Sequence, residues 1–168
     1  MTITLRIPGE PLAMPRAKAV ARGEQVRMYT PTSRKTKSGL RQSTGVAEYK
    51  ALMRCMAAEQ YTGPLLEGPV RIDCLWVFQR TKGMMWKKKP MPRIPKSNKP
   101  DRDNLDKMVL DSLTGVILSD DDQVVCGYLE KVYAAGDEQP HTLITIETLE
   151  EGQMATFRTF PESFRKNS

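Results

Sequence analysis

Two carboxylates and an amine lie close together between Lys99 and Lys107, where the sequence reads KPDRDNLDK. Asp101 and Asp103 stand two residues apart at the start of an expected helix, and Lys107 follows one turn inside it. Carboxylate oxygens are the ligands that hard divalent cations prefer. A bound cation with an amine beside it suits chemistry on phosphate. The segment therefore predicts a metal site that acts on a phosphate group.

The start of this helix decides whether the two carboxylates can share an ion. Residues i and i+2 point about 200° apart in a helix, but to the same side in extended chain. We therefore expect the helix to begin at or after Asp103, which Pro100 and the N-cap preference of aspartate favour. A structural alternative is an aspartate that only caps the helix, with Asp103 and Lys107 as an ordinary i,i+4 ion pair.

A second acidic group, Asp120-Asp121-Asp122, separates an apolar run from an expected strand. Three adjacent carboxylates repel one another, and a bound cation would relieve that repulsion. A solvated turn is the alternative, since aspartate favours turns. The spacing excludes an EF-hand counted from Asp101, because Leu105, Asp106 and Ser112 occupy positions 5, 6 and 12 of that loop.

Other metal and nuclease classes fit the sequence poorly. Pro100-Asp101 resembles the start of a PD…(D/E)xK pattern, but Lys107 follows on the same helix instead of on a strand. A histidine-based nuclease is not favoured, because His141 is the only histidine. A zinc site is not favoured either, because the cysteines are widely spaced. We expect buried thiols in a reducing cytoplasm at Cys55, Cys74 and Cys126.

Charge is distributed unevenly along the 168 residues, whose formal net charge is +6. Residues 1–100 carry 20 Lys+Arg against 6 Asp+Glu, and residues 101–168 carry 6 against 14. The halves thus differ in sign, at +14 and −8. We expect one half to bind a polyanion such as nucleic acid and the other to hold cations. Two solvated faces of different charge are the alternative.

Hydrophobic periodicity predicts an α+β domain with a mixed β-sheet and two main helices, in the order β-α-β-(loop)-α-β-β. We expect one domain over residues 1–150, a polar tail at 151–168, and a basic, turn-rich stretch at 12–42. No run approaches 18 apolar residues and no signal peptide is evident, so we expect a cytoplasmic protein. The expected strands are 2–7, 70–78, 123–133 and 142–149, and the expected helices are 43–61 and 104–113, the second ending at Gly115.

A basic segment without periodicity occupies residues 79–100 and leads directly into the acidic segment. Its prolines and glycine predict a flexible loop or arm. Lysines surround Trp86, a combination typical of loops that bind nucleic-acid strands. A solubilising loop is the alternative, and Trp86 either enters a DNA junction or packs on the protein body. The lysines concerned are Lys82, Lys87, Lys88 and Lys89.

These residues together resemble the RusA-type Holliday junction resolvases. The resemblance rests on KPDRDNLDK at 99–107, on LDSL with a glycine at 110–115, and on DDDQV at 120–124. The opening IPGEP, Arg16, YTP at 29–31, EGPV at 67–70 and Lys131 are also similar to that family. The resemblance spans about residues 3–148.

The resemblance implies a Mg²⁺-dependent endonuclease, with Mn²⁺ as a substitute, that acts as a homodimer on four-way junctions in DNA recombination and repair. It implies a bacterial or prophage origin. A non-catalytic binder of branched DNA and an RNA-directed nuclease on the same scaffold are the alternatives. The implied metal ligands are Asp101, Asp103 and Asp121, which form the catalytic set with Lys107, while Asp120 and Asp122 remain rivals to Asp121. The DNA-binding candidates are Arg16, Arg27, Lys82, Lys87, Lys88, Lys89, Lys99 and Lys131.

Overall fold

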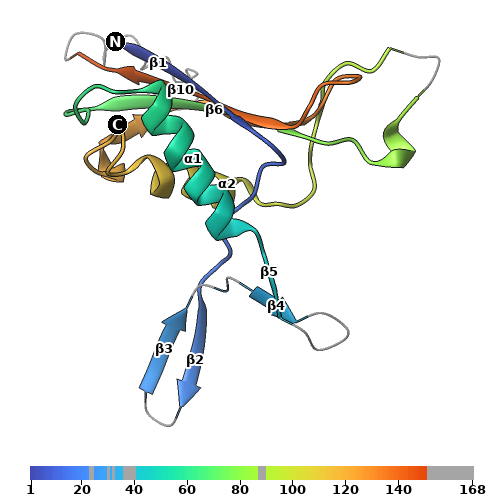
Figure 1. The fold of residues 1–168 in the computed structure, drawn as a ribbon, viewed down its shortest axis with the longest axis horizontal. Coiled ribbons are helices and arrows are strands. Elements are labelled where there is room, and N and C mark those ends of the chain that lie inside the picture. The colour runs from blue at the N-terminus through green and yellow to red at the C-terminus, as the bar shows by residue number, and fades with distance from the viewer. Residues whose placement is uncertain (23–24, 30, 32, 36–40, 87–89, 151–168) are drawn as a thin grey trace, which may run out of the picture.

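The segments with alternating apolar residues form one mixed sheet, in the order β1-β10-β6-β9-β7 with β8 also paired to β6 (Figure 1). The computed structural model describes residues 1–22, 25–29, 31, 33–35, 41–86 and 90–150. β6 runs parallel to β8 and β9, and the remaining pairs of this sheet are antiparallel. The bounds are β1 (Thr2–Pro8), β6 (Val70–Phe78), β7 (Ile94–Pro95), β8 (Val124–Cys126), β9 (Leu129–Tyr133) and β10 (His141–Thr148).

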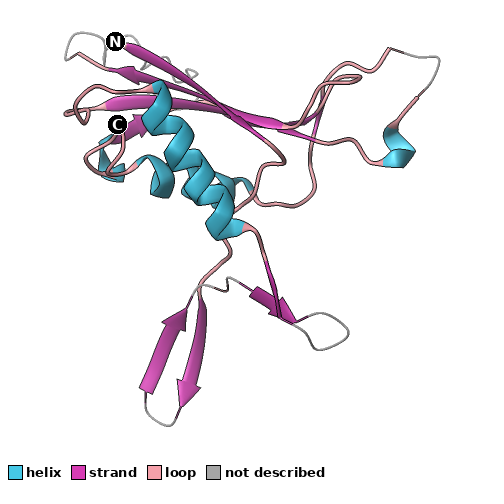
Figure 2. Ribbon diagram, in the orientation of Figure 1, coloured by secondary structure: helices cyan, strands magenta, loops and turns pink. Residues whose placement is uncertain are grey.

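Two helices, α1 (Val46–Gln60) and α2 (Arg102–Leu113), pack against each other and against the sheet (Figure 2). Their apolar stripes meet the inward side chains of β1, β6 and β10 in one core. Met53 and Leu105 are fully buried there. Gly115, with φ 73°, follows α2 in the left-handed conformation that ends many helices. The predicted α+β class, the mixed sheet and the two main helices are confirmed.

The strand predicted for residues 123–133 is wrong in its continuity, because it breaks between β8 and β9. A Cβ added to Gly127 would lie 1.7 Å from the carbonyl oxygen of Ile72 in β6. Only glycine allows two backbones to approach so closely. Because of this break, β8 pairs with the beginning of β6 and β9 pairs with its later part.

Residues 12–42, expected to be turn-rich, contain two hairpins that the sequence did not reveal. β2 (Lys18–Arg22) pairs with β3 (Gln25–Tyr29), and β4 (Ser33–Lys35) pairs with β5 (Arg41–Ser43). Both extend away from the sheet and helices (Figure 1).

The basic arm, defined as residues 79–95, extends from the end of β6 and returns through β7 (Figure 1). It contains a 3₁₀ turn, Lys82–Met84, before residues 87–89, which lie outside the described residues. The expected tail at 151–168 also lies outside them.

The cysteines only partly follow the expectation of buried thiols. Cys74 is buried, Cys126 is intermediate and Cys55 is exposed on α1. Burial raises the pKa of the Cys74 thiol, with the nearby Asp106 carboxylate adding to the effect. Within the described ranges, neither helix combines the length and apolar character needed to cross a membrane.

Candidate active site

Asp101 and Asp103 lie on either side of Arg102, the first residue of α2, in two different backbone conformations. Asp101 is the N-cap, with extended backbone at φ −70° and ψ 142°, and the helix begins at Arg102. The expectation of a helix start at or after Asp103 is therefore wrong. One extended residue before the helix is enough to bring the two carboxylates together, because the chain changes direction at Asp101.

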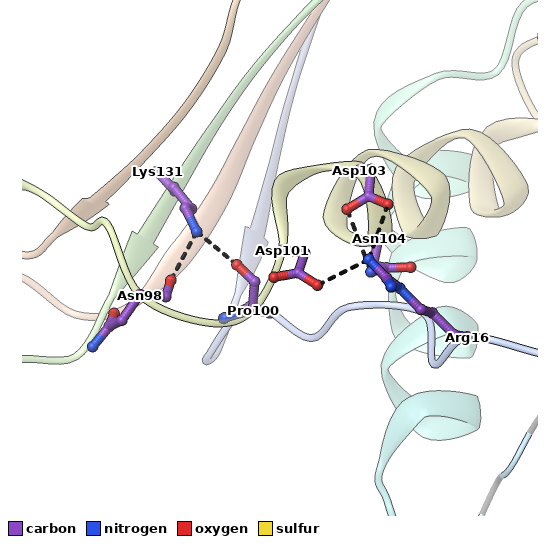
Figure 3. A network of polar contacts seen from close by, with 7 residues as sticks. All are labelled: Arg16, Asn98, Pro100, Asp101, Asp103, Asn104 and Lys131. Atoms are coloured by element: carbon purple, nitrogen blue, oxygen red, sulfur yellow. Dashed lines mark hydrogen bonds and ion pairs between the residues drawn. The ribbon is translucent and has the colours of Figure 1, made fainter.

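The two carboxylates converge on Arg16, which precedes β2 (Figure 3). Arg16 Nη2 lies 3.3 Å from Asp101 Oδ2 and 3.9 Å from Asp103 Oδ2. A backbone hydrogen bond of 2.9 Å from Met14 N–H to the Asn104 carbonyl holds the segment of Arg16 against α2. The Arg16 and Asp103 side chains are largely exposed and that of Asp101 is about half exposed, so the pairing is weak and exchangeable.

The capping interpretation of Asp101 fits its position but not its side chain. The Asp101 carboxylate accepts no capping hydrogen bond from the backbone. The described ion pairs also contain none between Asp103 and Lys107, since Asp103 faces Arg16 instead. Neither aspartate has the structural role that the sequence left open.

Lys131 on β9 fixes the chain that leads into α2 (Figure 3). Its ammonium donates to the carbonyls of Asn98, at 2.8 Å, and Pro100, at 2.7 Å. Asp101 follows directly, so β9 sets the position of the first carboxylate. Lys131 therefore has a positioning role, in addition to the DNA contact predicted from the sequence.

Lys96 is a second amine that organises this segment, and its side chain is only 8% exposed. Its Nζ lies 4.9 Å from the centroid of the Phe78 ring and 4.8 Å from that of Tyr133. It donates to the amide oxygen of Asn98, and the Tyr133 hydroxyl donates to the same oxygen at 3.0 Å. The ammonium is thus stabilised by two aromatic faces and a shared hydrogen-bond acceptor.

Lys107 and Asp106 lie further along α2 in different environments. Lys107 is exposed, and within the described ranges no ion pair engages its ammonium. Asp106 is half-buried beside Ile72 and Cys126. Burial raises the pKa of the Asp106 carboxyl, an effect that the nearby Arg102 charge partly offsets.

The second acidic group forms a 3₁₀ turn, Asp121–Gln123, at the start of β8. The Asp120 side chain accepts the Asp121 N–H at 2.7 Å and forms a capping box with Gln123. All three aspartates are exposed, but Asp120 has a structural role as the N-cap of the turn. This difference favours Asp121 and Asp122 over Asp120 as metal ligands.

Asp121 lies at the other end of β6 from Asp101. Gln123 anchors the acidic turn by donating to the carbonyls of Leu66 and Gly68, just before β6 begins. Pro100 is held by Lys131, which pairs with Trp76 near the end of β6. Six residues of strand from Val70 to Trp76 span about 20 Å. Accordingly, the described part of one chain contains no group of three acidic, histidine or cysteine residues placed to hold a metal ion.

The predicted DNA-binding residues occupy three separate parts of the molecule. Lys99 is exposed beside Pro100, and Lys82 is exposed in the arm. Arg27 is exposed on the β2–β3 hairpin, away from the carboxylates. The remaining predicted residues, Lys87, Lys88 and Lys89, lie outside the described ranges.

Sequence reasoning missed two buried cations, Arg80 and Lys96. Arg80 is 4% exposed and donates to backbone carbonyls of residues 84, 92 and 134. Both residues lie in a segment rich in basic residues, and no local pattern separates a buried cation from its exposed neighbours. Both cations are buried because β9, the chain after it and the arm pack together around them.

Comparison with known proteins identifies a family match. A family model described as Endodeoxyribonuclease RusA matches residues 8–147. The match covers both carboxylates at the start of α2, Lys107 and the whole acidic turn. A search of curated proteins finds no match.

Proposed function

The chain belongs to the RusA endodeoxyribonuclease family of metal-dependent Holliday junction resolvases, and on this premise we propose that the carboxylates at the start of α2 form the centre of its active site. The observation that carries the proposal is the convergence of Asp101 and Asp103 on one cationic nitrogen of Arg16. Two carboxylates that share a cation in this way are suited to share a metal ion. Asp121 and Lys107 complete the proposed set.

The donor atoms fit a hard divalent cation. Asp101 and Asp103 provide carboxylate oxygens that solvent reaches, at 45% and 70% side-chain exposure. Oxygen donors of this kind match Mg²⁺, for which Mn²⁺ is a substitute with similar ligand preference. When bound, the cation supplies a Lewis acid that activates water and neutralises charge on the phosphate.

The residues of the chain bind and orient the phosphodiester. The first backbone N–H groups of α2 have no helical acceptor, so the helix start is suited to an anion. We infer that Lys107, one turn along α2, holds the phosphate and stabilises the negative charge that develops on it. Arg16 would then move from the carboxylates to the DNA backbone.

Asp121 joins this site from the partner subunit in the proposed homodimer. Its place near the beginning of β6, about 20 Å along that strand from Asp101, supports this assignment over an assembly within one chain. A two-fold axis with antiparallel copies of α2 would place each acidic turn beside the other chain's Asp101. It would also create two equivalent sites, as paired symmetric nicks in a four-way junction require.

Two other functions would use the same scaffold, a non-catalytic binder of branched DNA and an RNA-directed nuclease. The exposed carboxylate pair opposes the first, because phosphate binding alone gains nothing from two negative charges at the contact surface. Family membership favours DNA over RNA. We place the activity in the cytoplasm of a bacterium, where recombining or phage DNA would supply junctions.

A cleavage assay on a labelled synthetic four-way junction tests the proposal. With Mg²⁺, the wild-type protein should make paired symmetric nicks in the junction and leave linear duplex intact. Asp103→Asn should lower cleavage by at least about 1,000-fold while junction binding persists. Asp137→Asn, at an exposed turn residue outside α2 and the acidic turn, is the matched control and should cleave normally. Wild-type turnover by Asp103→Asn would remove the proposal, and faster cleavage of structured RNA would favour the RNA-directed alternative.

A further inference from the structure

We propose that Trp86, presented by the basic arm, stacks on an unpaired base at the branch point of the junction and so distinguishes a junction from linear duplex. This inference rests on the proposed function for its substrate, but not on the identity of the metal ligands. It assigns the arm a partner of defined chemistry, the exposed face of a nucleobase.

The base of the arm is held by hydrogen bonds from the buried Arg80. Arg80 donates from Nε to the Ala134 carbonyl at 2.6 Å, and its terminal nitrogens donate to the carbonyls of Met84 and Pro92. One buried cation therefore joins both strands of the arm to the chain that follows β9. A buried guanidinium is stable only when carbonyls replace its hydration, so these contacts fix Met84 and Pro92 relative to Ala134.

Further contacts fix the returning strand of the arm. Arg93 pairs with Glu138 in the turn before β10, and the Arg93 guanidinium lowers the pKa of that carboxyl to about 2. The N–H of Gly136 donates to the Met91 carbonyl at 2.8 Å. The base of the arm is therefore fixed to the sheet that also positions Pro100 and Asp101.

Trp86 contacts these fixed residues of the arm but remains partly exposed to solvent. The ring centroid lies 5.8 Å from the Arg80 guanidinium carbon, and the backbone N–H of Trp86 donates to the Met91 sulfur at 3.3 Å. The residue is nevertheless 47% exposed, next to the equally exposed Met85. Trp86 and Met85 thus form an exposed apolar patch on the arm, with Arg80 over the Trp86 ring and nearly half of the Trp86 residue open to a ligand.

A nucleobase at a branch point fits this ring better than duplex DNA does. Lys82, exposed in the 3₁₀ turn four residues before Trp86, adds a positive charge that favours a polyanion. In linear duplex the base faces are already stacked, whereas a branch point can release a base to an aromatic side chain. Stacking of this kind tolerates any base, which suits an enzyme that recognises the shape of its substrate.

Intrinsic fluorescence provides a direct test, because the chain has only two tryptophans and Trp76 is 1% exposed. The experiment uses the full-length protein in EDTA, so that a four-way junction remains uncut. Junction binding should quench the Trp86 emission and protect it from acrylamide, while linear duplex at matched saturation should do neither. Trp86→Phe should remove this signal and retain most junction affinity.

Affinity measurements complete the test. Trp86→Ala should weaken junction binding by about 5- to 100-fold with little change in duplex binding. Tyr128→Ala removes another exposed aromatic residue, which lies before β9 and outside the arm, and should bind both DNAs normally. Equal quenching by junction and duplex, an absence of quenching, or equal loss of both affinities in Trp86→Ala would overturn the inference. None of these results depends on cleavage, so failure of the proposed metal site would be seen separately.

Discussion

Lys131 holds Pro100 through a hydrogen bond of 2.7 Å from its ammonium to the proline carbonyl. This contact joins the middle of β9 to the residue before the first carboxylate of the site. Lys131, which the sequence suggests as a phosphate contact, therefore also helps to position the two carboxylates.

Replacing Lys131 with methionine should impair cleavage more than binding. Methionine keeps the aliphatic volume but leaves the carbonyls of Asn98 and Pro100 without their donor, so the start of α2 should shift. We expect such a displacement of the Asp101 and Asp103 carboxylates to lower turnover by about 10- to 100-fold. Single-turnover cleavage and junction titrations at several salt concentrations provide the measurements. An intact turnover with a shallower salt dependence of binding would show a phosphate contact instead.

Replacing Arg16 with glutamine should strengthen metal binding in the absence of DNA. The Arg16 guanidinium faces both carboxylates and competes with a cation there. Exposed ion pairs are weak, so we expect a gain of about two- to fivefold in Mn²⁺ affinity by calorimetry. Arg27→Gln removes an exposed arginine from the β2–β3 hairpin and is the control. Equal metal affinities in the two variants would contradict competition by Arg16.

Asp106→Asn should stabilise the protein at neutral pH. Burial raises the pKa of this carboxyl in the folded state, so ionisation of Asp106 favours unfolding. The folded protein is therefore destabilised as the pH rises toward and through that raised pKa. Asparagine removes the charge. Urea unfolding should show a more stable variant at pH 7 and no difference below about pH 3.5, where the wild-type carboxyl is protonated in both states. A difference that does not change with pH would contradict this explanation, and Asp111→Asn controls for the loss of one helix charge.

Gly127→Ala should be severely destabilising, although the change adds only one methyl group. Its Cβ would meet the Ile72 carbonyl oxygen at 1.7 Å, so β6 and the chain joining β8 to β9 must separate. We expect a loss of at least about 3 kcal/mol in the free energy of unfolding. Gly83→Ala is the matched control, because nothing lies within 4 Å of its added Cβ. Similar thermal midpoints for the two variants would show that the strands yield easily at Gly127.

The fold could be predicted where burial follows a local period. β6 and α2 each place a continuous apolar face on the core, so their spacing is visible in the sequence. The hairpin of β2 and β3 could not be predicted in this way. Among the described residues, the core cluster includes none from either strand, and no apolar alternation marks them in the sequence.

The candidate site was predictable only in its local part. Asp101 and Asp103 are neighbours in sequence, and one helix start brings them together. The distance of Asp121 from them depends on the length of β6 and on the anchoring of Gln123, which no spacing motif contains. The buried roles of Arg80 and Lys96 depend on carbonyls and rings from distant segments.

We propose that each active site combines Asp103 of one subunit with Asp121 of the other, and mixing two inactive variants tests this arrangement. Asp103→Asn and Asp121→Asn proteins are each inactive by this account, but their heterodimer has one site with all of its carboxylates. Mixing them under exchange conditions should therefore restore single nicks in a four-way junction with Mg²⁺. If the mixture remains as inactive as its components while tagged subunits demonstrably exchange, the two subunits do not share their carboxylates and the proposed shared site is wrong.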